Sequence, residues 1–183
     1  MKRPIGFLSI DPGVTTGLAW GVFDLGAESV GEALLNGSKT GFAEATGSEQ
    51  WQVSSIVGMW EELEAYCKSE GIPCEIIIED FILRPGRASA DRAQLAPVRI
   101  TAMLEGLLLG REVGLVAGLG AEAFREITGT AMPPIVKQQV SAAKGFATRE
   151  RLERWGCWKV AMRHSRDAWR HIALRIATLS RDV

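Results

Sequence analysis

Apolar positions along this chain of 183 residues fall into short runs and helical repeats that alternate, a pattern typical of α/β proteins. Residues 5–10 form an apolar run that ends in an Asp-Pro-Gly turn, so they predict a buried strand. Residues 17–23 and 30–35 predict two further strands, separated by a Gly-containing turn. These three strands should form an antiparallel meander, and the Gly-, Ser- and Thr-rich residues 36–48 should form a loop.

The middle of the chain predicts a helix, a strand and a second helix. Residues 49–69 carry apolar side chains at helical spacing, and residues 75–79 form another apolar run. Because this fourth strand returns after a helix, it should lie parallel to the first. Residues 96–109 predict the second helix. Two stretches compete for a fifth strand, 113–117 and 129–132, and the pattern favours the later one.

The last quarter of the chain predicts helices. Residues 137–156 contain a basic helix, and residues 164–180 form the last helix, with Ala168, Ile172 and Ile176 as its buried stripe. The sequence thus predicts an α/β fold with a mixed five-stranded sheet, antiparallel over its first three strands and then parallel, flanked by helices. We see no internal boundary and interpret residues 1–183 as a single domain.

Composition places the chain among ordinary globular proteins. Apolar residues make up 46% and charged residues 23%, and no apolar stretch approaches the roughly 20 residues that span a bilayer. The first residues lead into only a short apolar run, which argues against a secretory signal. Three cysteines without metal-ligand spacing indicate reduced thiols, so a cytoplasmic protein with no membrane partner is expected.

The net charge of −1 conceals an uneven distribution. Residues 1–136 contain 10 Lys and Arg against 18 Asp and Glu, a balance of −8. Residues 137–183 contain 11 against 4, a balance of +7. A basic C-terminal quarter suits a polyanionic partner, although a solvated basic helix face would look the same.

Three carboxylates and an imidazole stand where predicted elements end or begin. Asp11 follows the first strand and Glu79 closes the fourth, so both should emerge at one edge of the sheet, where α/β folds place ligands. His164 and Asp167 lie three residues apart at the start of the last helix. Buried carboxylates are costly without a cation, and Mg²⁺ is a cation that favours carboxylate oxygens.

Such a cluster suits phosphodiester cleavage, because two metal ions about 4 Å apart can activate water and stabilise the leaving oxygen. His164 could bind metal or position the attacking water, and the sequence leaves both roles open. Each element alone has a plainer interpretation: the Asp-Pro-Gly segment as a turn, Glu79 as a solvated strand end, and His164 with Asp167 as a favourable helix start. Their occurrence together favours a shared site.

The same residues resemble a known family. Similarity to RuvC-type Holliday-junction resolvases of the ribonuclease H-like superfamily lies in Ile10-Asp11-Pro12-Gly13 with Thr16-Gly17, in Ile78-Glu79 and in His164-x-x-Asp167-Ala168. Similarity to the members encoded by bacteriophages lies in Ala147-Thr148-Arg149-Glu150-Arg151-Leu152-x-x-Trp155-Gly156 with His164-Ser165-Arg166-Asp167-Ala168. The resemblance covers most of the chain.

This resemblance implies a ribonuclease H-like fold and a homodimer, dependent on Mg²⁺ or Mn²⁺, that nicks a four-way DNA junction symmetrically. It implies a role in DNA recombination and repair in the cytoplasm of a bacterium or a phage-infected host cell. Catalysis and metal binding would both fall to Asp11, Glu79, His164 and Asp167. Family members carry either a carboxylate or a histidine where His164 stands.

One aromatic residue and several basic ones are candidates for DNA contact. The family's strand-separating aromatic lies just after the second carboxylate, and a basic loop follows it. Basic residues of the C-terminal quarter could follow the phosphate backbone. The candidates are Phe81, Arg84, Arg87, Arg92, Lys137, Lys144, Arg149 and Arg151.

Other functions remain compatible with these residues. A ribonuclease H-like nuclease acting on RNA or on an RNA–DNA hybrid would use the same basic segment, and a non-catalytic junction-binding module would need no metal. An actin-like ATPase could use residues 11–17 as a phosphate hairpin, but it requires a second hairpin that the sequence lacks. The apolar helix 98–109 offers either a dimer surface or simple burial against the sheet.

Overall fold

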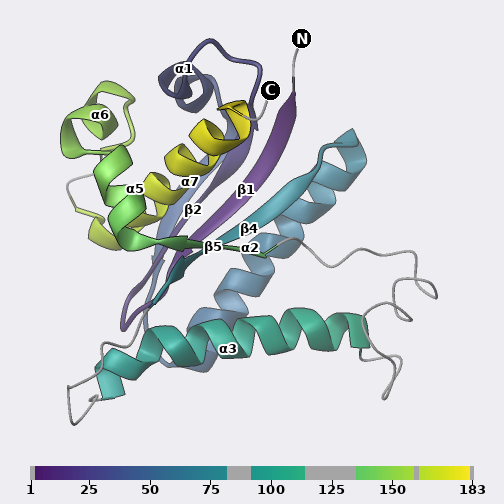
Figure 1. The fold of residues 1–183 in the computed structure, drawn as a ribbon. Helices are drawn as coiled ribbons and strands as arrows, with labels where there is room; N and C mark the ends of the chain where they lie inside the picture. The colour runs from purple at the N-terminus through teal and green to yellow at the C-terminus, as the bar shows by residue number, and fades with distance from the viewer. Residues whose placement is uncertain (1–2, 82–91, 114–134, 159–160, 182–183) are drawn as a thin grey trace.

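A five-stranded mixed sheet, in the order β3-β2-β1-β4-β5, organises the fold (Figure 1). The computed structural model describes residues 3–81, 92–113, 135–158 and 161–181. β1 pairs antiparallel with β2 and parallel with β4; β3 is antiparallel to β2, and β5 is parallel to β4. The expected mixed sheet is therefore confirmed. The strands are β1 (Pro4–Asp11), β2 (Thr16–Asp24), β3 (Ser38–Ala45), β4 (Cys74–Asp80) and β5 (Ile135–Gln139).

Helices cover both faces of this sheet. In Figure 1, α7 lies across one face, whereas α2 lies on the other face with α3 packed beside it. The three long helices confirm the predicted ones at 49–69, 96–109 and 164–180. The helices are α1 (Val30–Leu35), α2 (Glu49–Glu70), α3 (Arg92–Val113), α5 (Val140–Phe146), α6 (Arg149–Arg154) and α7 (Arg163–Arg181).

Each face of the sheet has its own hydrophobic core. Between the sheet and α7, the predicted stripe of Ala168, Ile172 and Ile176 is buried together with Phe7 and Ile77 of the strands. On the other face, side chains from α2 and α3 pack against the alternate positions of the same strands. Because β1 alternates between the two cores, Asp11 shares the α7 face with Phe7, two pleats earlier.

The prediction of a strand at 30–35 is wrong, because these residues form helix α1. The Ser29 hydroxyl accepts a hydrogen bond from the Glu32 N–H at 3.1 Å, and the Glu32 carboxylate accepts one from the Glu28 N–H at 2.8 Å. The first contact is the N-cap hydrogen bond of α1, and the second ties the residue before the cap to the first turn. The Ser-x-x-Glu spacing is the local signal that outweighs the apolar run.

The third strand instead lies within the stretch predicted to be a loop. Within the described residues, β3 pairs only with β2, so one of its edges has no described strand beside it. Its first three residues are exposed and the rest half-buried, which explains its polar, Gly-containing sequence.

The fifth strand of the described sheet is Ile135–Gln139, a segment that neither competing prediction includes. The stretches 114–117 and 129–132 lie outside the described residues, and Val113 ends α3. Within 137–156, where a basic helix is predicted, the end of β5 is followed by two short helices, α5 and the Arg-rich α6. Like β3, β5 is an edge strand, and only Gln138 of its five residues is buried.

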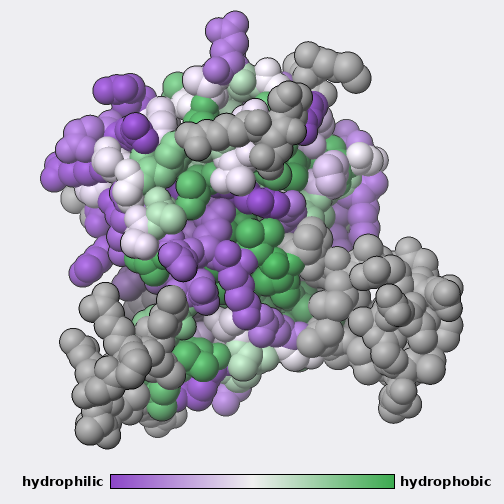
Figure 2. Space-filling model, in the orientation of Figure 1, coloured by the Kyte–Doolittle hydropathy of each residue, from purple (hydrophilic) through white to green (hydrophobic). Residues whose placement is uncertain are grey.

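Polar residues gather over α6 on the face that Figure 2 shows. Among the described residues, no helix has both the length and the apolar character needed to cross a bilayer.

Candidate active site

Asp11 and Glu79 meet at the ends of two adjacent parallel strands. The register pairs Ile10 of β1 with Ile78 of β4, so the residues that follow emerge side by side. Both carboxylates point to the α7 face, and they are close enough to share a hydrogen bond. The structure therefore brings together the two predicted strand-end carboxylates.

The pKa values of the two carboxyl groups are shifted in opposite directions. Burial raises the pKa of Asp11 to about 6; a hydrogen bond with His164 opposes the rise, and the nearby Glu79 charge adds to it. Burial also acts to raise the pKa of Glu79, but hydrogen bonds with His171 and Asp11 outweigh it, and the pKa is lowered. Without a bound cation, Asp11 thus keeps a proton more readily, and Glu79 carries the charge.

The hairpin that follows Asp11 is fastened to α2 by buried hydrogen bonds. Thr16 donates from its hydroxyl to the Gln52 side-chain oxygen at 2.5 Å, and the Gln52 amide donates to the Val14 carbonyl at 3.0 Å. Gln52 is buried, so these bonds exchange little with water. They fix the turn that sets the position of Asp11.

His164 lies in the first turn of α7 and contacts Asp11 directly. Its Nδ1 is 3.2 Å from Asp11 Oδ2, and this hydrogen bond raises the pKa of the imidazole. The His164 backbone N–H donates to the Glu44 carboxylate of β3 at 2.9 Å. The helix backbone sits against Gly17 of β2, where an added Cβ would lie 2.1 Å from the His164 carbonyl carbon. Gly17 is therefore required for this close approach.

Asp167 lies at the same end of α7 and is neutralised by two cations. Its carboxylate accepts from Lys144 Nζ of α5 at 3.1 Å and from Arg170 of its own helix at 3.2 Å. The charge of Asp167 also contributes to the raised pKa of Asp11, so the two carboxylates belong to one electrostatic cluster.

His171 completes the cluster, although the sequence analysis did not select it. It is buried, with Nε2 at 3.4 Å from Glu79 Oε2 and Nδ1 at 3.1 Å from the Gln138 side-chain oxygen. Gln138 is the neighbour of Glu79 across the β4–β5 ladder. The available signal was spacing: His171 follows His164 by seven residues, which places both on one side of a helix.

The donor chemistry of this cluster fits a hard divalent cation. Within the described ranges, no group of three or more His, Cys, Asp or Glu side chains is already arranged to hold a metal ion. Asp11 and Glu79 are nonetheless two neighbouring carboxyl groups, and the pKa of Asp11 is raised. Such a pair favours a bound cation, which can take the place of the proton on Asp11. Asp167 can join them by exchanging Lys144 or Arg170 for the metal.

The candidate DNA contacts are spread around this site. Phe81 follows β4 and is 37% exposed. Lys144 reaches the site through Asp167, whereas Lys137 pairs with Glu105 of α3 at 2.8 Å. Arg149 pairs with Glu153 within α6.

The remaining candidates for DNA contact are one arginine of α6 and three arginines that follow β4 in the chain. Arg151 donates to the Phe146 carbonyl. Arg92 is the first residue of α3, and its side chain is outside the described part. Arg84 and Arg87 lie outside the described residues.

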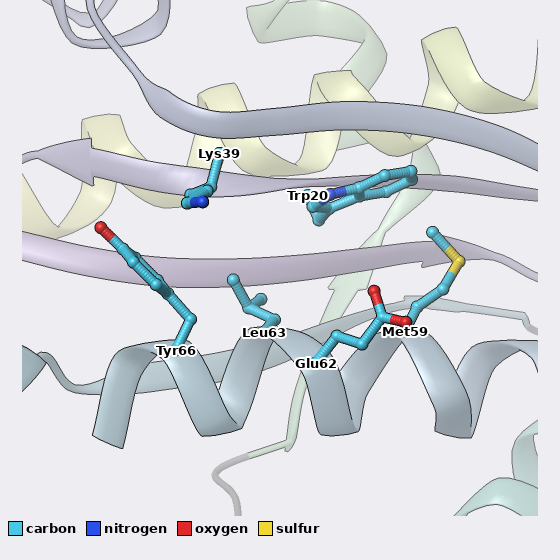
Figure 3. Close-up of a pocket in the computed structure, with 6 residues that line it drawn as sticks. All are labelled: Trp20, Lys39, Met59, Glu62, Leu63 and Tyr66. Carbon is cyan, nitrogen blue, oxygen red and sulfur yellow. The ribbon is translucent and has the colours of Figure 1, made fainter. Parts of the chain in front are cut away.

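A separate hollow of about 220 Å³ lies on the opposite face of the sheet, between β2, β3 and α2 (Figure 3). Trp20 and Tyr66 line it, and Lys39 Nζ lies 5.1 Å from the centre of the Tyr66 ring. Trp20 packs with the α2 core, so the sheet separates this hollow from the carboxylates.

Comparison with known proteins supports the fold. No protein-family model matches this sequence, and no curated protein matches it. The structure is similar to that of T. thermophilus RuvC in complex with Holliday junction substrate, with 12% identity, a TM-score of 0.51, and coverage of 96% of this chain and 95% of that one. A second structure, of Thermus thermophilus RuvC, aligns with 13% identity and a TM-score of 0.48 over 95% of each chain. With its mixed five-stranded sheet, this chain has a RuvC-like, ribonuclease H-like fold.

Proposed function

We propose that this chain is a divalent-metal-dependent endonuclease that resolves four-way DNA junctions, of the RuvC type. The observation that carries the proposal is the contact between Asp11 and Glu79 beneath the first turns of α7, which bring His164 and Asp167 to the same place. Its fold is shared with a RuvC whose structure was determined with a Holliday junction substrate. The C-terminal motifs around Thr148 and His164 support a relation to bacteriophage-encoded resolvases.

The four residues would divide the work as follows. Asp11, Glu79 and Asp167 supply carboxylate oxygens for Mg²⁺ or Mn²⁺, and such ions activate water and stabilise the charge on the leaving oxygen of a phosphodiester. His164 holds the Asp11 carboxylate through Nδ1, and its side chain is 40% exposed, so a substrate arriving from solvent can reach it. The raised pKa of His164 favours a positive charge there, which suits a phosphate.

Branched DNA would lie along the basic C-terminal quarter. Lys144 stands beside Asp167, and α6 carries further arginines at exposed positions. These groups contact phosphates without selecting a base sequence, as recognition of a branched shape requires. Phe81 follows Glu79 by two residues and is exposed, and it would contact a base near the branch point.

We also propose that the enzyme is a homodimer, because two nicks placed symmetrically in a junction call for two sites related by a twofold axis. Helix α3 buries Ile100, Leu104 and Leu108 in the core that it shares with α2. Among the described side chains of α3, Val98 and Leu107 are 39% and 49% exposed, and a twofold contact would use them.

The deciding experiment compares end-labelled four-way junction, flap, linear duplex and RNA–DNA hybrid in Mg²⁺ and in Mn²⁺. We expect paired nicks in the junction, little cleavage of linear duplex, and none in EDTA. Preferential cutting of the hybrid would assign the chain to the ribonucleases. Tight junction binding without cleavage in either metal would indicate a binding module.

A further inference from the structure

We propose that His171 is a positioning residue, whose Nε2–H fixes the Glu79 carboxylate in its place beside Asp11. This inference rests on the proposed function, because it assigns a role at the same site. His171 belongs to none of the sequence motifs that identify the site, and its side chain is only 2% exposed, so it acts through Glu79 and not on a substrate.

Both ring nitrogens of His171 have a polar partner on the sheet. Nδ1 lies 3.1 Å from the Gln138 side-chain oxygen, and Nε2 lies 3.4 Å from Glu79 Oε2. A neutral imidazole donates from one nitrogen and accepts at the other, and a carboxylate can only accept. Because the Glu79 carboxylate can only accept, Nε2 carries a proton. Nδ1 either carries a second proton and donates to the Gln138 oxygen that faces it, or accepts from the Gln138 NH₂ group when that amide is turned over; in both cases Nε2–H points at Glu79.

The position of the helix over β4 does not depend on this contact. One turn beyond His171, Arg175 makes a two-bond pair with Glu75 of the same strand, at 2.8 and 3.0 Å. At the other end, Glu44 and Gly17 hold the first turn of α7. Because α7 is fastened on both sides of His171, replacing this side chain should release Glu79 without moving the helix.

A role in packing alone does not explain a histidine at this place. The neighbours Ile172, Ala173 and Trp169 on α7 fill the core with apolar groups, and a buried imidazole without partners would be costly. The two histidines of α7, His164 and His171, each meet one of the two strand-end carboxylates. Outer hydrogen bonds of this kind orient carboxylates that bind metals, and their loss typically costs 10–100-fold in metal affinity or activity.

The test uses His171→Phe, which keeps a ring but has no donor, and His171→Gln, which retains an amide donor. Trp169→Phe is the matched control, since it alters the same helix in the core without touching Glu79. Mn²⁺ binding is measured by titration, alongside junction cleavage and thermal unfolding. We expect His171→Phe to weaken Mn²⁺ binding by about 10–100-fold, His171→Gln to weaken it less, and Trp169→Phe to lower stability with Mn²⁺ affinity unchanged.

A second readout needs neither metal nor DNA. The chain has only two histidines, so the ¹⁵N signals of the imidazoles can be assigned from the His171 variants. The Nε2 signal of His171 should shift in Glu79→Gln and stay unchanged in Glu75→Gln, which removes the other α7-paired carboxylate of β4.

The outcomes separate this inference from the proposed function. Cleavage and Mn²⁺ binding that are normal in His171→Phe would overturn the positioning role and leave the nuclease standing. A wild-type protein that binds no Mn²⁺ and cuts no junction would refute the nuclease. The ¹⁵N signal of His171 would then test the contact with Glu79 by itself, and an Nε2 signal that does not shift in Glu79→Gln would overturn that contact.

Discussion

At the scale of single residues, the site buries the Asp11 carboxyl group where its charged form is unfavourable. Burial beside Glu79 raises the pKa of Asp11 to about 6. A carboxyl group whose pKa is higher in the folded protein stabilises the fold below its ordinary pKa of about 4, and this contribution is lost as the pH rises through the folded value. Near neutral pH, the metal-free site therefore opposes folding.

Replacing Asp11 by Asn should abolish cleavage while leaving junction binding largely intact. In EDTA the variant should also be more stable than the wild type at neutral pH, by on the order of 2 kcal/mol. Because protonated aspartate resembles asparagine, this advantage should shrink as the pH falls through about 6 and be nearly gone at about 4. Thermal unfolding across this pH range measures the difference.

Asp80→Asn is the control for this substitution, because it removes a carboxylate from the end of the same β4 without touching the contact between Asp11 and Glu79. It should keep cleavage. Cleavage by Asp11→Asn at a rate near that of the wild type would remove Asp11 from the catalytic residues.

Gly17 offers a steric test of the same site. An alanine Cβ here would lie 2.1 Å from the His164 carbonyl carbon, so the first turn of α7 must move away from β2. Gly17→Ala should cost about 1–3 kcal/mol, as overpacking does, and reduce cleavage together with stability. Chemical denaturation and the junction assay measure the two effects.

Gly58→Ala is its matched control, since a Cβ at Gly58 in α2 meets nothing within 4 Å. That variant should gain up to about 1 kcal/mol from helix propensity and cleave normally. If Gly17→Ala left both stability and cleavage unchanged, the close approach of α7 to β2 would be refuted.

At the scale of elements, the central strands were predictable and the edge strands were not. β2, β1 and β4 are buried between the α7 and α2 cores, so their apolar runs are visible in the sequence. In the part of the chain that the structure describes, β3 and β5 each have a partner strand on one side only. They carry polar residues, and such a segment resembles a loop when its partner strand is not known. Asp11 and Glu79 stand on central strands, and so their meeting could be expected, whereas Gln138 and Glu44 on the edges were missed.

Helix α7 depends on a cap that comes from one of those edge strands. Glu44 of β3 accepts the His164 N–H at 2.9 Å, and Ser165 donates from its hydroxyl to the Ala43 carbonyl at 2.6 Å. An acceptor at a helix start is worth about 0.5–2 kcal/mol, and a negative charge there also favours the helix dipole. The edge strand thereby positions His164.

Glu44→Leu should therefore lose about 0.5–2 kcal/mol of stability and reduce cleavage, because the cap and the His164 backbone are coupled. Glu44→Gln keeps an oxygen acceptor and should recover most of both. Unfolding by denaturant and junction cleavage provide the two readings. Equal behaviour of the Leu and Gln variants would show that the hydrogen bond to His164 contributes nothing.

At the scale of the whole molecule, the basic and acidic parts of the sequence lie on different elements of the fold. Among the described residues that follow position 136, the basic ones lie on β5, α5, α6 and α7, and Lys144 of α5 reaches the carboxylate cluster through Asp167. Many acidic residues lie instead on α2, at the other face of the sheet. A polyanion should be drawn to the side of the molecule where the proposed chemistry takes place.

This arrangement predicts a steep and localised salt dependence of junction binding. Each phosphate contact adds roughly 0.9 to the negative slope of log affinity against log salt. Replacing both Arg149 and Arg151 on α6 by Gln should make that slope shallower by about 2, with the same change for different junction sequences.

Lys68→Gln is the control for this prediction. Lys68 is an exposed cation at the end of α2, beside the start of β4, whereas Glu79 lies near the other end of that strand. Its slope should equal that of the wild type. A reduction about half as large in Lys68→Gln, which removes one charge and not two, would mean that net charge alone attracts DNA, and the arginines of α6 would then have no directing role.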